Sequence, residues 1–177
     1  MKTLFKYLFI VLFFSGLGFS QSKILYINSY HEQYNSAIIQ TKAVRDILEP
    51  EDITLKFIHM NTKTIKKDDL RRLEALRVKK VIEQYKPDLV IASDDAASKY
   101  VVKEYYKNSA LPFVFIGVNW STKSYAYPYK NVTGQIEVEL ADKLIKELRK
   151  YTNGKKVGFL SGDTSTDKNF NASTSSI

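Results

Sequence analysis

The chain has 177 residues, a formal net charge of +8, 44% hydrophobic residues and no cysteine. This length and composition are typical of one globular domain of ordinary size or slightly more. The absence of cysteine excludes disulfides, thiolate metal sites and cysteine nucleophiles. The positive charge is spread over many lysines and accompanies no nucleic-acid-binding motif, so we expect no nucleic-acid partner.

The first twenty residues have the pattern of a secretory signal peptide. Lys2 and Lys6 precede an apolar run over residues 8–14, and the small residues Gly18 and Ser20 stand at positions −3 and −1 of a predicted cut before Gln21. The run is shorter than the roughly 20 residues that span a bilayer. We therefore expect a periplasmic or secreted protein. The alternative is an uncleaved signal segment, which would be the protein's one contact with the membrane.

The first half of the mature chain alternates between strand and helix patterns. A buried strand is predicted over 24–28, and an alternating, half-exposed edge strand over 53–60. A helix with an apolar stripe is predicted over 36–48, with Asn35 or Ser36 as its N-cap. The next helix is predicted over 68–85, with acidic residues in its first turn. The stripe of the first helix is expected to face the core, and its residues are Ile38, Ile39, Ala43, Val44, Ile47 and Leu48.

The same alternation continues toward the C-terminus. Its predicted elements are a strand over 89–92, a helix from Asp94 or Asp95 to about 107, a strand that Pro112 opens, an extended segment over 131–135, a helix over 138–151 and a strand over 156–160. Such alternation predicts an α/β fold, a Rossmann-like and mostly parallel sheet with helices on both faces. The aromatic loop over 120–129 hints at an apolar or aromatic portion of a ligand.

Three of these strands break off into polar clusters. The strands and clusters read ILYI-NSYH at 24–31, LVIA-SDD at 89–95 and FVFI-GVNW at 113–120. Ligands of open α/β sheets bind at the carboxyl ends of the strands, so these clusters are the candidate site.

Together with NVTG at 131–134, these motifs resemble the periplasmic substrate-binding proteins of the ABC-transporter substrate-binding family, which have the type I periplasmic-binding fold. The same module is similar to the extracytoplasmic sensor of some bacterial histidine kinases and diguanylate cyclases. The resemblance covers about residues 23–167 and implies two Rossmann-like lobes that close on a small organic ligand. We expect a signal peptide at 1–20, lobe one at 21–135, the start of an incomplete lobe two at 136–164 and a polar, disordered tail at 165–177. The chain is thus expected to be a fragment or a truncated copy.

The expected ligand contacts follow the three strand ends. Asp94 or Asp95 could pair with a ligand ammonium group, and Ser93 with the helix N-terminus could hold a carboxylate, as an α-amino acid requires. The competing hypothesis is N-capping by the aspartates. Hinge or crossover structure is expected at Asn131, Thr133 and Gly134. The complete set of expected ligand-binding residues is Ser29, Tyr30, His31, Tyr34, Ser93, Asp94, Asp95, Gly117, Asn119 and Trp120.

Enzymatic chemistry is not expected. The chain has no G-x-S-x-G nucleophile motif and no glycine-rich nucleotide loop. His31 and His59 are its two histidines and lie in different segments, so we expect no metal, no cofactor and no catalytic residue. The sequence therefore predicts a solute-binding protein that delivers a small molecule to the membrane permease of an ABC importer. The alternative is the ligand-sensing domain of a membrane receptor, a histidine kinase or diguanylate cyclase.

Overall fold

The computed structural model of the protein describes residues 21–138, 140–154, 156–158, 160 and 162. The predicted signal peptide and the predicted tail over 165–177 lie outside these residues. Within the described part of the chain, no helix combines the length and the hydropathy needed to cross a membrane.

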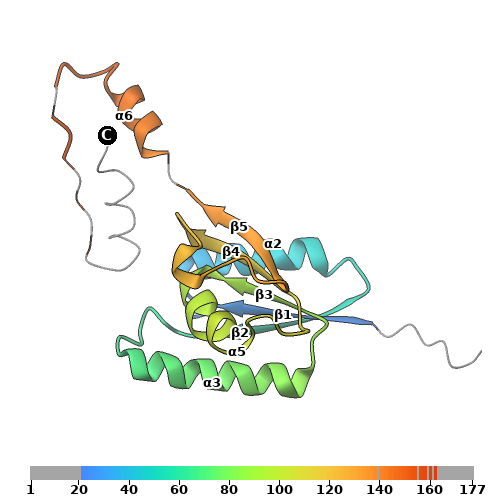
Figure 1. Cartoon of the computed structure of the whole chain (residues 1–177). Coiled ribbons are helices and arrows are strands. Elements are labelled where there is room, and N and C mark those ends of the chain that lie inside the picture. Colours follow the sequence, from blue (N-terminus) through green and yellow to red (C-terminus); the bar gives the residue numbers. More distant parts are fainter. Residues whose placement is uncertain (1–20, 139, 155, 159, 161, 163–177) are drawn as a thin grey trace, which may run out of the picture.

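Five strands form one parallel sheet in the order β2-β1-β3-β4-β5 (Figure 1). Its strands are β1 (Ser22–Asn28), β2 (Ile53–His59), β3 (Leu89–Ser93), β4 (Phe113–Asn119) and β5 (Val132–Glu137). β2 lies at an edge with alternating burial, which confirms the half-exposed edge strand. The order confirms the predicted α/β fold.

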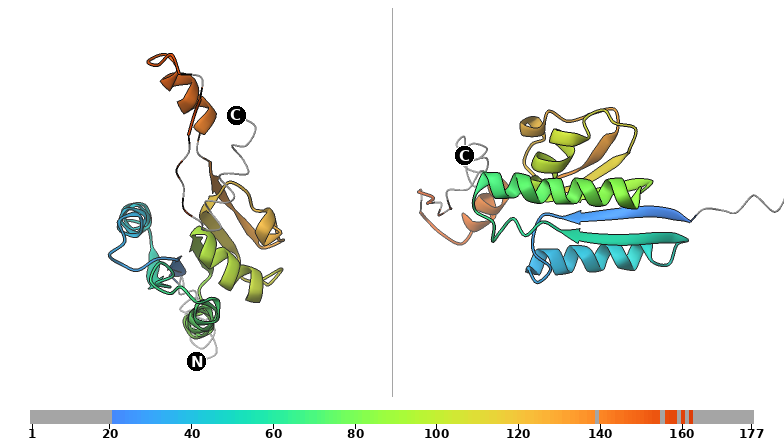
Figure 2. Two further views of the ribbon diagram at one scale, coloured as in Figure 1. Left: turned by 90° about the vertical axis from the view of Figure 1, so that its left-hand side faces the viewer. Right: turned by 90° about the horizontal axis from the view of Figure 1, so that it is seen from below.

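Helices cover both faces of the sheet (Figure 2). α2 (Asn35–Leu48) lies on one face and α3 (Asp68–Tyr85) on the other. The helix after β3 packs beside α3 and has three parts, α4 (Asp94–Ala96), a π-helical turn η1 (Ala97–Val102) and α5 (Lys103–Tyr105). The central strands are apolar because they are covered on both sides: Leu25, Tyr26 and Ile27 of β1 are fully buried.

The two faces are covered unequally. The α3 side of the sheet packs against Ala75, Val78 and Ile82 of α3 and against the buried side of η1. On the other side, Ala37 is the one buried residue of α2, while Ile38 and Ile39 are more than half exposed. The prediction that the apolar stripe of this helix faces the core is therefore wrong for most of the stripe. α2 packs against the edge strand β2, and an apolar stripe is buried only where an opposing layer covers it.

Two further predictions about helix and strand ends are corrected. Tyr34, rather than Asn35 or Ser36, stands at the N-cap of α2, and no side chain caps the helix. The described residues of the predicted strand over 156–160 form no strand. They lie away from the free edge of β5 in Figure 1, and a short apolar run becomes a strand only where it pairs with a neighbour.

The C-terminal helix stands apart from the sheet. α6 (Ala141–Leu148) is shorter than the predicted helix over 138–151 and projects beyond the end of β5 (Figure 1). Leu140, Leu144 and Leu148 are each more than half exposed at this helix. The site described next is built from the sheet, its loops, α2 and the start of the helix that follows β3.

Candidate ligand-binding site at the strand ends

The carboxyl ends of β1 and β3 lie side by side at the point where the strand order of the sheet reverses. The chain leaves β1 toward β2 on one side and leaves β3 toward β4 on the other. In a sheet of this order, ligands bind in the crevice at that switch point. Asn28 pairs with Ser93 across the two strands, so the predicted clusters that follow them are neighbours in space.

Ser29 and Ser93 lie beneath the surface of this crevice, and both are fully buried. The Ser29 hydroxyl donates to the Ser93 carbonyl oxygen (2.6 Å) and accepts from the Ala97 amide (2.8 Å). The Ser93 hydroxyl lies 2.5 Å from Asp94 Oδ2 and 2.7 Å from Gln40 Oε1, and its single proton can be donated to either. Both serines therefore join strands and helix internally, and a direct contact with a ligand would require these bonds to open.

Asp94 begins the helix in a backbone conformation that residues other than glycine seldom adopt. Its φ is +67° and its side chain is buried, with only 5% exposure. Tyr30 donates its phenolic proton to Asp94 Oδ1 (3.1 Å). Such backbone strain concentrates at ligand sites, and the π-helical turn that follows is another feature enriched there. Hydrogen bonds from neutral donors thus hold Asp94 in a strained backbone conformation.

The environment of Asp94 disfavours its negative charge. Burial raises the pKa of this carboxyl, and the neighbouring charge of Asp95 raises it further, against the hydrogen bonds from Ser93, Tyr30 and Gln40. Burial and the charge of Asp94 also raise the pKa of Tyr30, so the Tyr30 phenol remains a donor at neutral pH. None of the ion pairs within the described residues involves Asp94. A cationic group brought to this carboxylate would be favoured, because a buried charge is costly until it is paired.

Asp95 links the helix to the end of β4. It accepts hydrogen bonds from Asn119 Nδ2 (2.9 Å) and from the Tyr125 hydroxyl (2.6 Å). Tyr125 belongs to the short 3-10 helix η2 (Lys123–Tyr125), and burial together with Asp95 raises its pKa. Sequence reasoning singled out Asp95 and Asn119 but not Tyr125, whose one signal was its place in an aromatic loop.

The three tyrosines of that aromatic loop belong to the core. Tyr125, Tyr127 and Tyr129 are each less than 10% exposed, and Tyr127 lies 5.1 Å from the Phe115 ring. The inference of an aromatic ligand from this loop is therefore not supported. Large aromatic side chains are packed away from water wherever a neighbouring layer can cover them, and here the η1 side of the sheet does so.

Gly117 allows β4 to pass close to Asp94. Its φ is +66°, and a side-chain Cβ there would lie 3.2 Å from Asp94 Oδ1 and 3.5 Å from Gln40 Nε2. The β4–β5 register shifts between Phe115 and Val118, around this glycine. An open depression of about 510 Å³ lies beside it, lined by Gln40, Ile116, Gly117, Gln135, Ile136, Glu137 and Val138.

A cluster of rings stands at the loop after β1. The ring centroids of Tyr30 and Tyr34 are 4.8 Å apart, and those of His31 and Tyr34 are 5.6 Å apart. The Lys63 ammonium lies 4.7 Å from the centroid of Tyr30 and 5.4 Å from that of Tyr34. These three predicted residues are therefore gathered together, and the structure adds a lysine that sequence reasoning missed.

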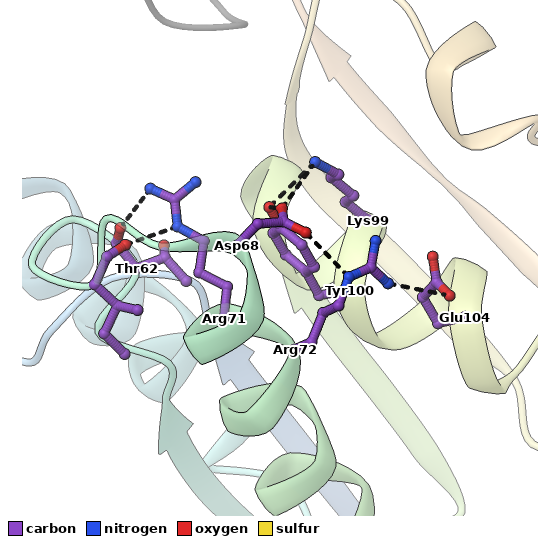
Figure 3. A network of polar contacts seen from close by, with 8 residues as sticks. Thr62, Asp68, Arg71, Arg72, Lys99, Tyr100 and Glu104 are labelled. Atoms are coloured by element: carbon purple, nitrogen blue, oxygen red, sulfur yellow. Dashed lines mark hydrogen bonds and ion pairs between the residues drawn. The ribbon is translucent and has the colours of Figure 1, made fainter.

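The loop that carries Lys63 is firmly attached on both sides. Thr62 donates to the Ser29 carbonyl oxygen through its hydroxyl (2.6 Å) and its amide (2.9 Å), and Arg71 holds the Thr62 carbonyl (3.2 Å). Figure 3 shows how the adjacent start of α3 is joined to η1 and α5. There Asp68 accepts from Tyr100 (2.6 Å) and from Arg72, whose guanidinium also pairs with Glu104.

The remaining predicted residues occupy different places. Trp120 has a φ of +62° and follows Asn119, with its amide bonded to the Glu137 carbonyl oxygen (2.9 Å). Asn131 precedes β5 at the opposite edge of the sheet, where its amide donates to Tyr106, Ser109 and Leu111. Thr133 and Gly134 lie within β5 itself. The predicted crossover segment is thus a fifth strand, because its extended residues pair with β4.

Among the described residues, no group of three or more histidine, aspartate or glutamate side chains is arranged to hold a metal ion. The arrangement offers a buried carboxylate, phenol and amide hydrogen-bonding groups, aromatic faces and one lysine. These are the elements of a site for a small polar molecule.

Together, the parallel sheet and its helices define an α/β, Rossmann-like domain with polar residues at its topological switch point. The chain matches no protein-family model and no curated protein. A solved structure with a similar fold is the ABC domain in complex with L-Trp from Streptococcus pneumonia, at a TM-score of 0.52 and 15% sequence identity. The match covers 73% of this chain but 43% of that domain, so this chain spans less than half of the neighbour's length. At this identity the likeness concerns the fold.

Proposed function

We propose that this chain is the ligand-binding part of an extracytoplasmic solute-binding protein that serves an ABC-type importer. It would capture a small organic molecule, such as an amino acid, without covalent chemistry. The observation that carries the proposal is Asp94, a buried carboxylate without an ionic partner among the described residues, held at the switch point by Tyr30 and Ser93. The L-Trp complex of the structural neighbour supports an amino acid as the kind of ligand.

In the proposed mechanism, the strand ends of this lobe form one wall of the site. Ligand binds first to that wall through hydrogen bonds and charge, and closure of a second wall over it removes water. The permease of the importer is the proposed protein partner, and residues 1–20 would direct the protein to the periplasm or the exterior.

A receptor sensor is the second candidate, because the same kind of domain with an uncleaved residue 1–20 segment would be anchored at the membrane. The two functions predict different N-termini for the protein isolated from its host. A mature start at Gln21 supports the solute-binding protein, and an intact Met1 supports the membrane-anchored sensor.

The proposed binding function is tested by thermal unfolding and calorimetric titration of the full chain against the twenty amino acids and other small metabolites. A ligand present at 100 times its Kd stabilises the folded protein by about 2.7 kcal/mol, which raises the midpoint by several degrees. Asp94→Asn should remove most of this stabilisation. The matched control is Asp52→Asn, which changes an exposed aspartate just before β2, at the amino end of the strand and away from the strand ends that form the site. Absence of stabilisation by every compound would contradict the proposal.

A further inference from the structure

Two opposite charges at the candidate site have no ionic partner within the described residues. Asp94 is a buried carboxylate bonded only to neutral donors there. Lys63 takes part in none of the ion pairs of the described chain, and its ammonium rests on the faces of Tyr30 and Tyr34 instead. A molecule that carries one charge of each sign could form an ion pair with both residues.

Tyr30 connects the two charges. Its hydroxyl donates to Asp94 Oδ1 at 3.1 Å, and its ring face lies 4.7 Å from the Lys63 ammonium. The carboxylate and the ammonium are therefore at the edge and over the face of the same ring. Neither Asp94 nor Lys63 belongs to an ion pair of the described residues, so the two charges are not paired with each other.

Lys63 is placed by its backbone. Thr62 makes two hydrogen bonds to the Ser29 carbonyl oxygen, and Thr64 closes a turn through its amide and hydroxyl on the Asn61 carbonyl oxygen (3.0 and 2.8 Å). The Lys63 side chain remains exposed at this turn. Contact with two aromatic faces restricts where its ammonium lies, and a restricted lysine loses less entropy when it binds an anion.

The Ser93 hydroxyl is less available to the carboxylate of a ligand than the sequence suggested. The Ser29 hydroxyl already occupies the Ala97 amide, and the buried Ser93 hydroxyl is bonded to Asp94 or Gln40. Lys63 is a cation at the same strand ends with no such internal bond among the described residues.

We propose that Lys63 is the carboxylate-binding, specificity-determining residue of a zwitterion site, which takes an α-amino acid with its carboxylate on Lys63 and its ammonium on Asp94. This proposal rests on the proposed function and specifies the ligand class of the same site. It makes the site selective for molecules that carry both charges, because an amine or an acid alone leaves one of the two residues unpaired.

The experiment is a calorimetric titration of the full chain with L-tryptophan and with tryptamine, which keeps the indole and the ammonium but lacks the carboxylate. We expect L-tryptophan to bind the wild type at least tenfold more tightly than tryptamine. Lys63→Gln should weaken L-tryptophan binding by roughly 10- to 100-fold, the usual effect of losing a hydrogen bond to a charged group, and should leave tryptamine binding unchanged. Lys63→Arg should restore most of the affinity.

The control variant is Lys56→Gln. Lys56 is also an exposed lysine over a tyrosine ring, 5.0 Å from the centroid of Tyr85, but it lies on β2 and not at the strand ends. It should change neither affinity. Equal losses in Lys63→Gln and Lys56→Gln, or equal binding of both probes to the wild type, would overturn the zwitterion site while solute binding stands. Binding of no amino acid at all would overturn the proposed function and this proposal with it.

Discussion

Replacing Ser29 by alanine tests whether this residue is part of the framework or an exposed ligand contact. The change removes a 2.6 Å hydrogen bond to the Ser93 carbonyl oxygen and a 2.8 Å bond from the Ala97 amide, both fully buried. The amide keeps a partner in the Asp94 carbonyl oxygen, so its loss is partial. At about 1 kcal/mol for each buried bond, with more where a partner is left unpaired, we expect a loss of about 2 kcal/mol in the free energy of unfolding.

The assay is equilibrium urea unfolding followed by circular dichroism, with a thermal scan as a second measurement. For a domain of this size, about 2 kcal/mol corresponds to a fall of roughly 8 °C in Tm. Ser22→Ala, at the first residue of the β1 strand that precedes Ser29, is the control, because Ser22 is exposed and its replacement should cost almost nothing. If Ser29→Ala were as stable as Ser22→Ala, the argument that Ser29 holds β1, β3 and the helix together would be refuted.

Three further predictions concern the site and its supports. Burial raises the pKa of Asp94 in the folded protein above its ordinary value of 3.8. Between that ordinary value and the folded-state pKa, the native state binds more protons than the unfolded state. The free energy of unfolding should therefore fall as the pH rises from about 4. Asp94→Asn should abolish this fall in urea titrations at several pH values, and an unchanged slope would contradict it. Gly134→Ala should lower the free energy of unfolding by about 3 kcal/mol or prevent folding, because its Cβ would lie 2.1 Å from a β4 carbonyl oxygen. Gly154→Ala is the control and should leave stability unchanged. If the two variants had the same soluble yield and the same Tm, this prediction would be wrong. Tyr125→Phe removes a 2.6 Å hydrogen bond to the Asp95 carboxylate in α4 and should lower the free energy of unfolding by about 1–2 kcal/mol. The control is Tyr151→Phe, which changes an exposed tyrosine. A loss below about 0.5 kcal/mol in Tyr125→Phe would refute the prediction.

The order of the elements was predictable because local patterns carry it. The helix over 68–85 has the bounds of α3, and the apolar runs at 24–27 and 89–92 became β1 and β3. Acidic residues at the start of α3, and short apolar runs between polar segments, are determined by residues close together in sequence.

The failures have a common physical origin. The stripe of α2 was expected in the core, and residues 156–160 were expected to form a strand. Both patterns are correct locally, but burial and strand pairing depend on what lies opposite in space. A pattern can show that a face is apolar, and it cannot show whether another layer covers it.

The candidate site divides in the same way. That Ser29, Asp94 and Asn119 lie at one edge of the sheet followed from the sequence, since the ends of parallel strands meet there. Their roles did not follow from it. The sequence cannot tell that Ser29 faces inward to Ser93, or that Lys63 rests on Tyr30, because these contacts join segments 33 to 64 residues apart.

By itself, the sequence determined the α/β class, the parallel strands and the polar residues at their carboxyl ends, because each depends on local periodicity and on strand ends that must coincide. The tertiary structure alone decided that β5 completes the sheet, that the tyrosines after Trp120 enter the core, and that Asp94 is buried beside Tyr30. Those outcomes depend on which surfaces come to face one another. Burial, strain and charge pairing are properties of such contacts rather than of any single segment.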